Sequence, residues 1–290
     1  MPIVKKISGF LHLYRLDVCV IFFFLYFLGS YVAAGFYFNL PGTLLVAILI
    51  SGISINFIYV LNSWSDADID KINKPERPIP SNIVSKSQAF TYALMLLALS
   101  LAYPVILFGV TSRAALFLLF PLAGILYSNP VYSFKKRKYL ALSLITATAF
   151  LVCFLGYSSN NGAISPVLLV STCMFIASCV AIVPLKDLPD VEGDAAGNAD
   201  NWFKKGGQRK RFFFSALFLA ASAILGFLLA DAYLEAITLM NLAYFLILLW
   251  VFHRFAITMK KFYRSLLLGI VLDAVVFCVW YALLHVGLFT

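Results

Sequence analysis

The chain has 290 residues, of which 62% are hydrophobic and 12% are charged, and its mean hydropathy is +0.94. A soluble globular domain carries about twice this share of charged residues. The composition therefore excludes a water-soluble globular protein and indicates a polytopic membrane protein. The net charge of +9 does not point to nucleic acid, because the chain offers no soluble face that could carry a basic stripe.

Nine apolar segments approach or exceed the length that crosses a bilayer. We expect membrane helices near 18–38, 44–61, 89–110, 114–127, 139–157, 166–185, 212–230, 236–252 and 265–288. The first segment is too long for the hydrophobic part of a cleaved signal peptide, so we expect a retained helix. The fourth segment is the shortest and contains Pro121, and Pro104 is expected to kink the third.

The basic residues orient these helices, because Lys and Arg concentrate on the cytoplasmic side of membrane proteins. If the N-terminus is cytoplasmic, 21 of the 22 basic residues fall in cytoplasmic segments, and only Arg113 falls outside. The sequence therefore predicts nine helices, a cytoplasmic N-terminus and Thr290 on the opposite side. The chain is expected to be a single domain of the cell membrane whose active site faces the cytoplasm.

Acidic residues concentrate in two of these cytoplasmic segments. Nine of the 13 acidic residues lie there: Asp66, Asp68, Asp70 and Glu76 follow the second helix, and Asp187, Asp190, Glu192, Asp194 and Asp200 follow the sixth. Asn62, Asp66 and Asp70 are spaced at i, i+4 and i+8, so on a helix they share one face. Asp190 and Asp194 repeat the i, i+4 step.

Carboxylates stacked in this way repel one another unless a cation lies between them. Mg²⁺ takes one or two carboxylates and fills its other positions with water and phosphate oxygens of a substrate. We therefore expect Mg²⁺ and a phosphate-bearing substrate at these clusters. Asp68 lies off the shared face and is expected to be solvated.

The two clusters also share a register. The separation from Asp66 to Asp190 equals that from Asp70 to Asp194, and each cluster follows the second helix of a predicted four-helix set. The pattern indicates an internal repeat of helices 1–4 and 5–8, with the two halves facing a central cavity and the ninth helix closing the bundle.

The segment from Asn62 to Asp70, with the proline-rich stretch through Arg77, resembles the first signature, NxxxDxxxD, of the UbiA superfamily of intramembrane prenyltransferases. The segment from Lys186 to Asp194 resembles the second signature, DxxxD. The resemblance implies a nine-helix bundle around a central cavity capped by cytoplasmic loops. It also implies two Mg²⁺ ions that bridge carboxylates to the diphosphate of a prenyl donor, whose ionisation gives an allylic cation that a lipophilic acceptor attacks.

The resemblance also implies roles for individual residues. Asn62, Asp66 and Asp70 would hold one ion, and Asp190 and Asp194 the other. Residues implied to contact the diphosphate are Arg77, Tyr127, either Lys135 or Lys136, and Lys186, with Asp187 beside the second motif. After Asp194 the sequence departs from the usual family pattern. The acceptor is therefore open between an ether-lipid glycerol phosphate, a quinone precursor and a tetrapyrrole.

Three alternative functions can be weighed against the sequence. A UbiA-type terpene cyclase would keep both aspartate motifs but fold one prenyl diphosphate onto itself without an acceptor. A transferase that uses a CDP-alcohol would need a DGxxAR element, which the chain lacks. An ion-coupled transporter would place its acidic residues near the middle of the membrane, whereas most of these lie in predicted cytoplasmic segments.

Overall fold

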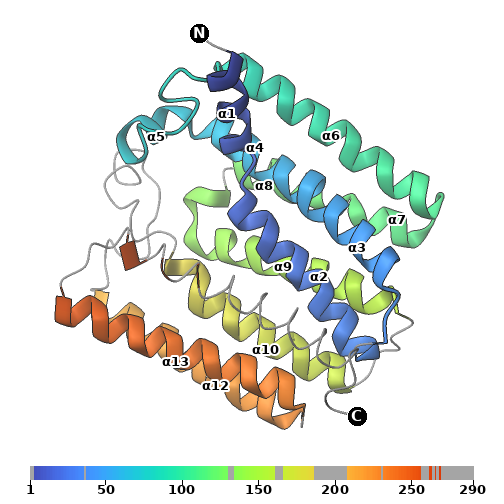
Figure 1. The fold of residues 1–290 in the computed structure, drawn as a ribbon, viewed down its shortest axis with the longest axis vertical. Coiled ribbons are helices and arrows are strands. Elements are labelled where there is room, and N and C mark those ends of the chain that lie inside the picture. Colours follow the sequence, from blue (N-terminus) through green and yellow to red (C-terminus); the bar gives the residue numbers. More distant parts are fainter. Residues whose placement is uncertain are drawn as a thin grey trace. The chain divides into compact units, whose positions relative to one another are not determined.

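The computed structural model describes residues 3–35, 37–129, 134–160, 166–185, 208–229, 231–255, 261–262, 265 and 268. Every regular element within these residues is a helix, and none of them lies in a strand (Figure 1). The all-α fold class is therefore confirmed.

The chain divides into two compact units. Unit 1 comprises Met1–Phe23, Leu44–Val152 and Asp190–Asn201, and unit 2 comprises Phe24–Thr43, Cys153–Pro189 and Trp202–Thr290.

Six helices in the described part of the chain are long and apolar enough to cross a membrane: Lys6–Ala34, Leu40–Ser65, Lys86–Phe108, Lys138–Ser158, Lys210–Leu228 and Leu234–Arg254. Two shorter apolar helices lie at Ser112–Ser128 and Leu169–Leu185. These eight occupy the positions of the first eight predicted segments. Of the ninth, only Ser265 and Leu268 are among the described residues. The count of nine, the central cavity and the cytoplasmic N-terminus stay predictions.

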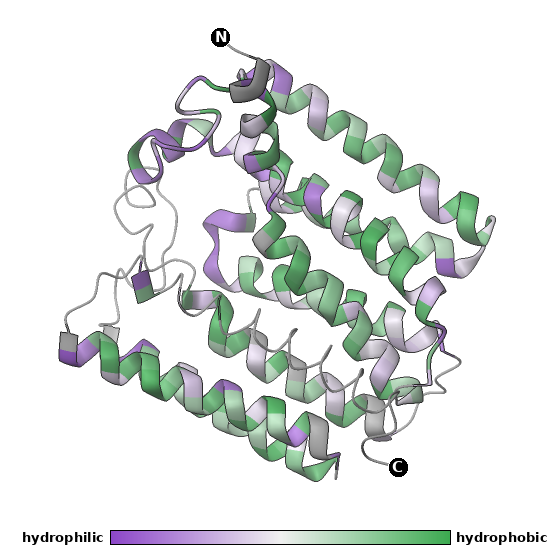
Figure 2. Ribbon diagram, in the orientation of Figure 1, coloured by the Kyte–Doolittle hydropathy of each residue, from purple (hydrophilic) through white to green (hydrophobic). Residues whose placement is uncertain are grey.

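The surfaces of the long helices suit a lipid environment. Large apolar side chains such as Met95, Ile106 and Trp250 are more than half exposed, and hydrophobic residues dominate these helices in Figure 2. In a bilayer such side chains meet lipid tails, while the backbone polar groups are satisfied inside each helix. The hydrophilic residues gather instead near α5 and the basic segment that precedes α9 (Figure 2).

Unit 1 contains most of the first half of the chain. Its elements are α1 (Ile3–Leu13), the start of α2 (Leu16–Ala34), most of α3 (Leu40–Leu49), the π-helix η1 (Ile50–Ile55), α4 (Asn56–Ser65), α5 (Ala67–Asn73), α6 (Lys86–Phe108), α7 (Ser112–Phe117), α8 (Leu119–Ser128), the 3₁₀ helix η2 (Phe134–Lys136) and most of α9 (Lys138–Ser158). The second predicted helix therefore extends beyond residue 61 to Ser65 and contains a π-helical segment that the sequence did not indicate.

The π-helical segment is tied to α6 by buried hydroxyl groups. The Oγ atom of Ser54 lies 2.7 Å from Ser100 Oγ and 2.9 Å from the Tyr103 hydroxyl. Hydrogen bonds between small polar side chains contribute to helix association in lipid, where packing gains no hydrophobic driving force. Pro104 follows this cluster and lies within α6.

The segment between α5 and α6 folds into consecutive turns. The backbone N–H groups of Ile83 and Val84 both donate to the Pro78 carbonyl, at 2.9 and 3.0 Å. Asn82 has a φ of 58°, a left-handed conformation that asparagine tolerates better than most residues. Ser85 then begins α6 with a capping box, in which its hydroxyl accepts from the N–H of Gln88.

α1 packs directly against this turn segment. A Cβ atom on Gly9 would lie 2.5 Å from the Ile83 side chain, so a larger residue there would displace that side chain. Leu13, Val60 and Val84 are buried in the apolar cluster that joins α1, α4 and the turns. α1, α4 and the turns after α5 therefore form one packed region.

Unit 2 contains α10 (Pro166–Ile182), α12 (Gln208–Leu228), α13 (Ala232–Phe255) and parts of α2 and α9. Within unit 2, α2 and α9 lie with their backbones in direct contact. A Cβ atom on Gly29 would lie 1.8 Å from the Cys153 carbonyl oxygen, and a Cβ atom on Gly156 would lie 2.0 Å from the Tyr26 carbonyl oxygen. Small residues permit this close packing in membrane proteins. Serine hydroxyls join α10 to α12.

Candidate metal and diphosphate site

Asn62, Asp66 and Asp70 are placed one helical turn apart in unit 1. The N–H of Asp66 donates to the Asn62 carbonyl at 2.8 Å, and the N–H of Asp70 donates to the Asp66 carbonyl at 2.8 Å. Asp66 itself, at φ −90° and ψ 2°, joins α4 to α5. The i, i+4 and i+8 spacing therefore corresponds to successive turns, although the helix changes direction at its central residue.

Asp70 is a buried carboxylate in an ion pair. It is only 4% exposed, and its Oδ2 atom lies 2.6 Å from Nη1 of Arg77. Burial raises the pKa of Asp70, and the guanidinium of Arg77 opposes that rise. Arg77 is held in place by the turn that follows α5, in which its N–H donates to the Lys74 carbonyl.

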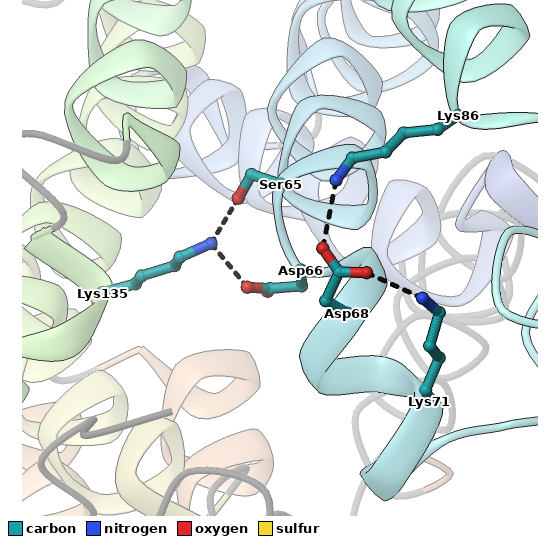
Figure 3. Close-up of polar contacts among 6 residues, drawn as sticks. All are labelled: Ser65, Asp66, Asp68, Lys71, Lys86 and Lys135. Carbon is teal, nitrogen blue, oxygen red and sulfur yellow. Dashed lines mark hydrogen bonds and ion pairs between the residues drawn. The ribbon is translucent and has the colours of Figure 1, made fainter. Parts of the chain in front are cut away.

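Asp66 forms an ion pair with Lys135, one of the two lysines between which the sequence does not decide. Nζ of Lys135 lies 2.5 Å from Asp66 Oδ1 and also donates to the hydroxyl of Ser65 (Figure 3). Lys136 is exposed, and no ion pair of its side chain is found among the described residues. Of the two candidates, the structure brings Lys135 to the first motif.

Asp68 faces away from this arrangement. Its side chain is 71% exposed and pairs with Lys71 at 2.8 Å and with Lys86 at 3.3 Å (Figure 3). The hydrogen bond from Lys71 is the main cause that lowers the pKa of Asp68. The expectation that Asp68 lies off the shared face and is solvated agrees with this geometry.

The chemistry of these side chains fits Mg²⁺. Oδ1 of Asn62 is buried and has no hydrogen-bond partner among the described residues, which is costly unless a ligand satisfies it. Together with the Asp66 and Asp70 carboxylates it offers only oxygen ligands, as Mg²⁺ prefers. Within the described residues no group of three or more His, Cys, Asp or Glu side chains comes together.

For the remaining predicted site residues, the proposed roles stay predictions. Asp190 and Asp194, with their neighbours Lys186 and Asp187, lie outside the described residues, so the second metal site stays a prediction. Tyr127 lies half-buried in the last turn of α8. Its contact with a diphosphate also stays a prediction.

A pocket beside the first motif includes residues that the sequence did not single out. It lies within unit 1 and is lined by His12, Leu13, Arg15, Ser63, Asp70, Arg77, Pro78, Ile79 and Pro80. His12 and Arg15 are about 50 residues from the motif in sequence, so no local spacing could connect them to it. The only available signal was the basic charge of Arg15 directly before the first membrane segment.

Comparison with known proteins gives one family. The sequence profile of the UbiA prenyltransferase family matches residues 22–262. A digeranylgeranylglyceryl phosphate synthase from Methanococcus aeolicus is 32% identical over 192 residues. That match covers 65% of this chain and 65% of the relative, so the chain matches just under two thirds of the relative's length.

Solved structures show the same fold. A UbiA homolog from Archaeoglobus fulgidus, bound to DMAPP and Mg²⁺, superposes with a TM-score of 0.65 at 18% identity, covering 92% of this chain and 98% of that one. A UbiA homolog from Aeropyrum pernix without ligand gives a TM-score of 0.69 at 17% identity, covering 91% of this chain and 98% of that one. At these identities the likeness concerns the fold.

Proposed function

Because the chain belongs to the UbiA prenyltransferase family, we propose that it is a Mg²⁺-dependent intramembrane prenyltransferase that uses a prenyl diphosphate. The observation that carries this proposal is the first motif. There, two carboxylates and an amide oxygen without a hydrogen-bond partner among the described residues lie on successive helical turns, and each carboxylate is paired with a cation, Lys135 or Arg77.

Each residue of the motif has a definite task in this reaction. Asn62, Asp66 and Asp70 would hold one Mg²⁺ ion, and Asp190 and Asp194 a second. Bound Mg²⁺ would neutralise the charge that develops on the leaving diphosphate. Arg77 and Lys135 present their positive charges next to the same carboxylates and would bind the diphosphate oxygens, with Tyr127 and Lys186 as further candidates.

The chemical step breaks the bond between the allylic carbon and the diphosphate oxygen, and the electron pair leaves with the diphosphate. A hydroxyl oxygen of the acceptor then bonds to the allylic carbon, and its proton passes to the released diphosphate. The low polarity of membrane helices limits the access of water, which would otherwise capture the cation.

We propose a glyceryl phosphate ether as the acceptor. The Methanococcus aeolicus relative is named for a product in which a glyceryl phosphate carries two geranylgeranyl groups. Such a product forms when a prenyl group is added to the free hydroxyl of a glyceryl phosphate that already carries one chain. Quinone precursors and tetrapyrroles become comparison substrates in the test.

The test uses purified protein in lipid nanodiscs, supplied with Mg²⁺, geranylgeranyl diphosphate and one acceptor at a time. We expect transfer that requires both the acceptor and Mg²⁺ and stops on addition of EDTA. Asp66→Ala and Asp190→Ala should each reduce turnover by at least about 100-fold, the scale of losing one preorganised contact to a developing anion. Lys135→Met should reduce it more than Lys136→Met.

Asp68→Ala provides the matched control, because Asp68 belongs to the same acidic cluster but is exposed and faces away. It should retain nearly all activity. Efficient formation of a cyclic product from geranylgeranyl diphosphate alone would instead identify the protein as a terpene cyclase. Full activity of the Asp66→Ala protein would contradict the proposed metal site.

A further inference from the structure

The pocket beside Asp70 is lined both by the first motif and by the N-terminal helix. Asp70 and Arg77 belong both to the candidate metal site and to the pocket lining, whereas Asp66 and Lys135 do not line it. His12, at the end of α1, and Arg15, in the link to α2, also line it. The pocket therefore shares Asp70 and Arg77 with the candidate metal and diphosphate site and adds His12 and Arg15 beside it.

The charge of the pocket suits an anion. Among the described residues that line it, Asp70 is the only carboxylate, and it is neutralised by Arg77 at 2.6 Å. The other basic groups of the lining are the guanidinium of Arg15 and the imidazole of His12. A guanidinium can form bidentate hydrogen bonds to phosphate oxygens, which fix both the position and the orientation of the phosphate.

The surroundings of Arg15 give that guanidinium a defined position. Its Cζ atom lies 5.7 Å from the centre of the Tyr59 ring on α4, and its side chain is half-buried. The adjoining Leu13 is 2% exposed in the cluster that joins α1 to α4, and Gly9 allows α1 to lie close to the turns after α5. The basic groups of the lining and the metal motif thus belong to one packed region of unit 1.

The rest of the lining has the character expected around an ether headgroup. Leu13, Pro78, Ile79 and Pro80 supply apolar surface, and Ser63 adds a hydroxyl one residue after Asn62. A small polar headgroup entering this pocket would meet both basic groups and apolar surface. An inorganic ion would leave the apolar part of the lining unused.

We propose that this pocket binds the phosphate monoester of a prenylated glyceryl phosphate acceptor, with Arg15 as its principal ligand and His12 as a second donor. The inference rests on the proposed prenyltransferase function and adds a second anion site to it. In this arrangement the acceptor phosphate at Arg15 lies next to the donor diphosphate at Lys135 and Arg77, and Arg77 contributes to the lining of both positions.

The decisive experiment removes the phosphate from the acceptor and the guanidinium from the protein, singly and together. Wild-type and Arg15→Gln proteins are compared on a monoprenyl glyceryl phosphate and on the same ether without its phosphate. In the wild type, loss of the phosphate should lower kcat/KM by roughly 10- to 100-fold, the scale of a hydrogen bond between charged groups. In Arg15→Gln that preference should fall to within about 3-fold.

Arg113→Gln is the matched control. Arg113 also lies over an aromatic ring, with its Cζ atom 4.2 Å from the centre of Phe108, but it does not line the pocket. This variant should keep the full preference for the phosphorylated acceptor. His12→Gln should reduce the preference less than Arg15→Gln, and Arg15→Lys should restore part of it.

Two results would overturn the inference. One is an Arg15→Gln protein that keeps the wild-type preference for phosphate. The other is a rise in KM for the prenyl diphosphate with no change for the acceptor, which would assign the pocket to the donor. Stabilisation of the wild type against heat by the phosphorylated ether, absent in Arg15→Gln, tests the site without turnover. If the wild type binds that ether but transfers nothing to it, the proposed function fails while the site stands.

Discussion

Replacement of Arg77 by Met tests whether the buried Asp70 carboxylate is charged and depends on the Arg77 cation for the stability of the fold. The change leaves the Asp70 carboxylate 4% exposed and without the guanidinium that lies 2.6 Å from it. Removing one partner of a buried ion pair costs about 3–5 kcal/mol. This cost cannot exceed the free energy of protonating the Asp70 carboxylate, because the neutral acid can be buried without a neighbouring cation.

That limit follows from the ordinary pKa of 3.8 in the unfolded chain. At pH 7, protonating Asp70 costs about 4 kcal/mol, at about 1.4 kcal/mol for each pH unit above 3.8. We therefore expect Arg77→Met to lose about 3–4 kcal/mol of unfolding free energy at pH 7. Burial already raises the pKa of Asp70, so the penalty should shrink as the pH falls, to at most about 2 kcal/mol at pH 5.

The assay is unfolding in mixed micelles with increasing SDS, on metal-free wild-type, Arg77→Met, Asp70→Asn and double-variant proteins. The double variant should be more stable than Arg77→Met, because the neutral amide removes the unpaired charge. An Arg77→Met protein as stable as the wild type would refute the reasoning. So would a double variant that is less stable than both single variants.

Three further predictions concern the scaffold. Gly156→Leu should destabilise the protein in the same assay by more than about 3 kcal/mol, since even a Cβ atom there would lie 2.0 Å from the Tyr26 carbonyl oxygen; an unchanged midpoint would contradict the backbone contact. Ser85→Ala should cost about 1 kcal/mol through loss of the cap of α6, with Ser85→Asp near the wild type. Reporter fusions should place the segment 128–138 in the cytoplasm and Thr290 outside; both on one side would show a miscounted helix.

The sequence predicted the membrane helices well because lipid imposes long apolar segments. The positions of eight predicted segments coincide with apolar helices in the structure. The spacing of Asn62, Asp66 and Asp70 also predicted their stacking on successive turns, and the off-face position of Asp68. These features depend on local periodicity, which a sequence records directly.

Features that depend on contacts between distant segments could not be predicted in this way. The choice of Lys135 over Lys136 depends on how the segment before α9 meets the end of α4. The approach of Arg15 and His12 to Asp70 depends on packing of α1 against the turns after α5. The π-helical segment has no signature in hydropathy, because it changes the hydrogen-bond pattern and leaves the composition apolar.

That π-helical segment sets the direction in which the first motif faces. A π-helical turn accommodates one more residue than an α-helical turn, and each residue of an α-helix turns the chain by about 100°. Rewinding Ile50–Ile55 into an α-helix with all of its residues kept would therefore rotate everything after it by about 100°. The side chains of Asn62 and Asp66 would then leave the side on which Lys135 lies. An unbroken α-helix would be more regular, but it would turn the same motif away from Lys135.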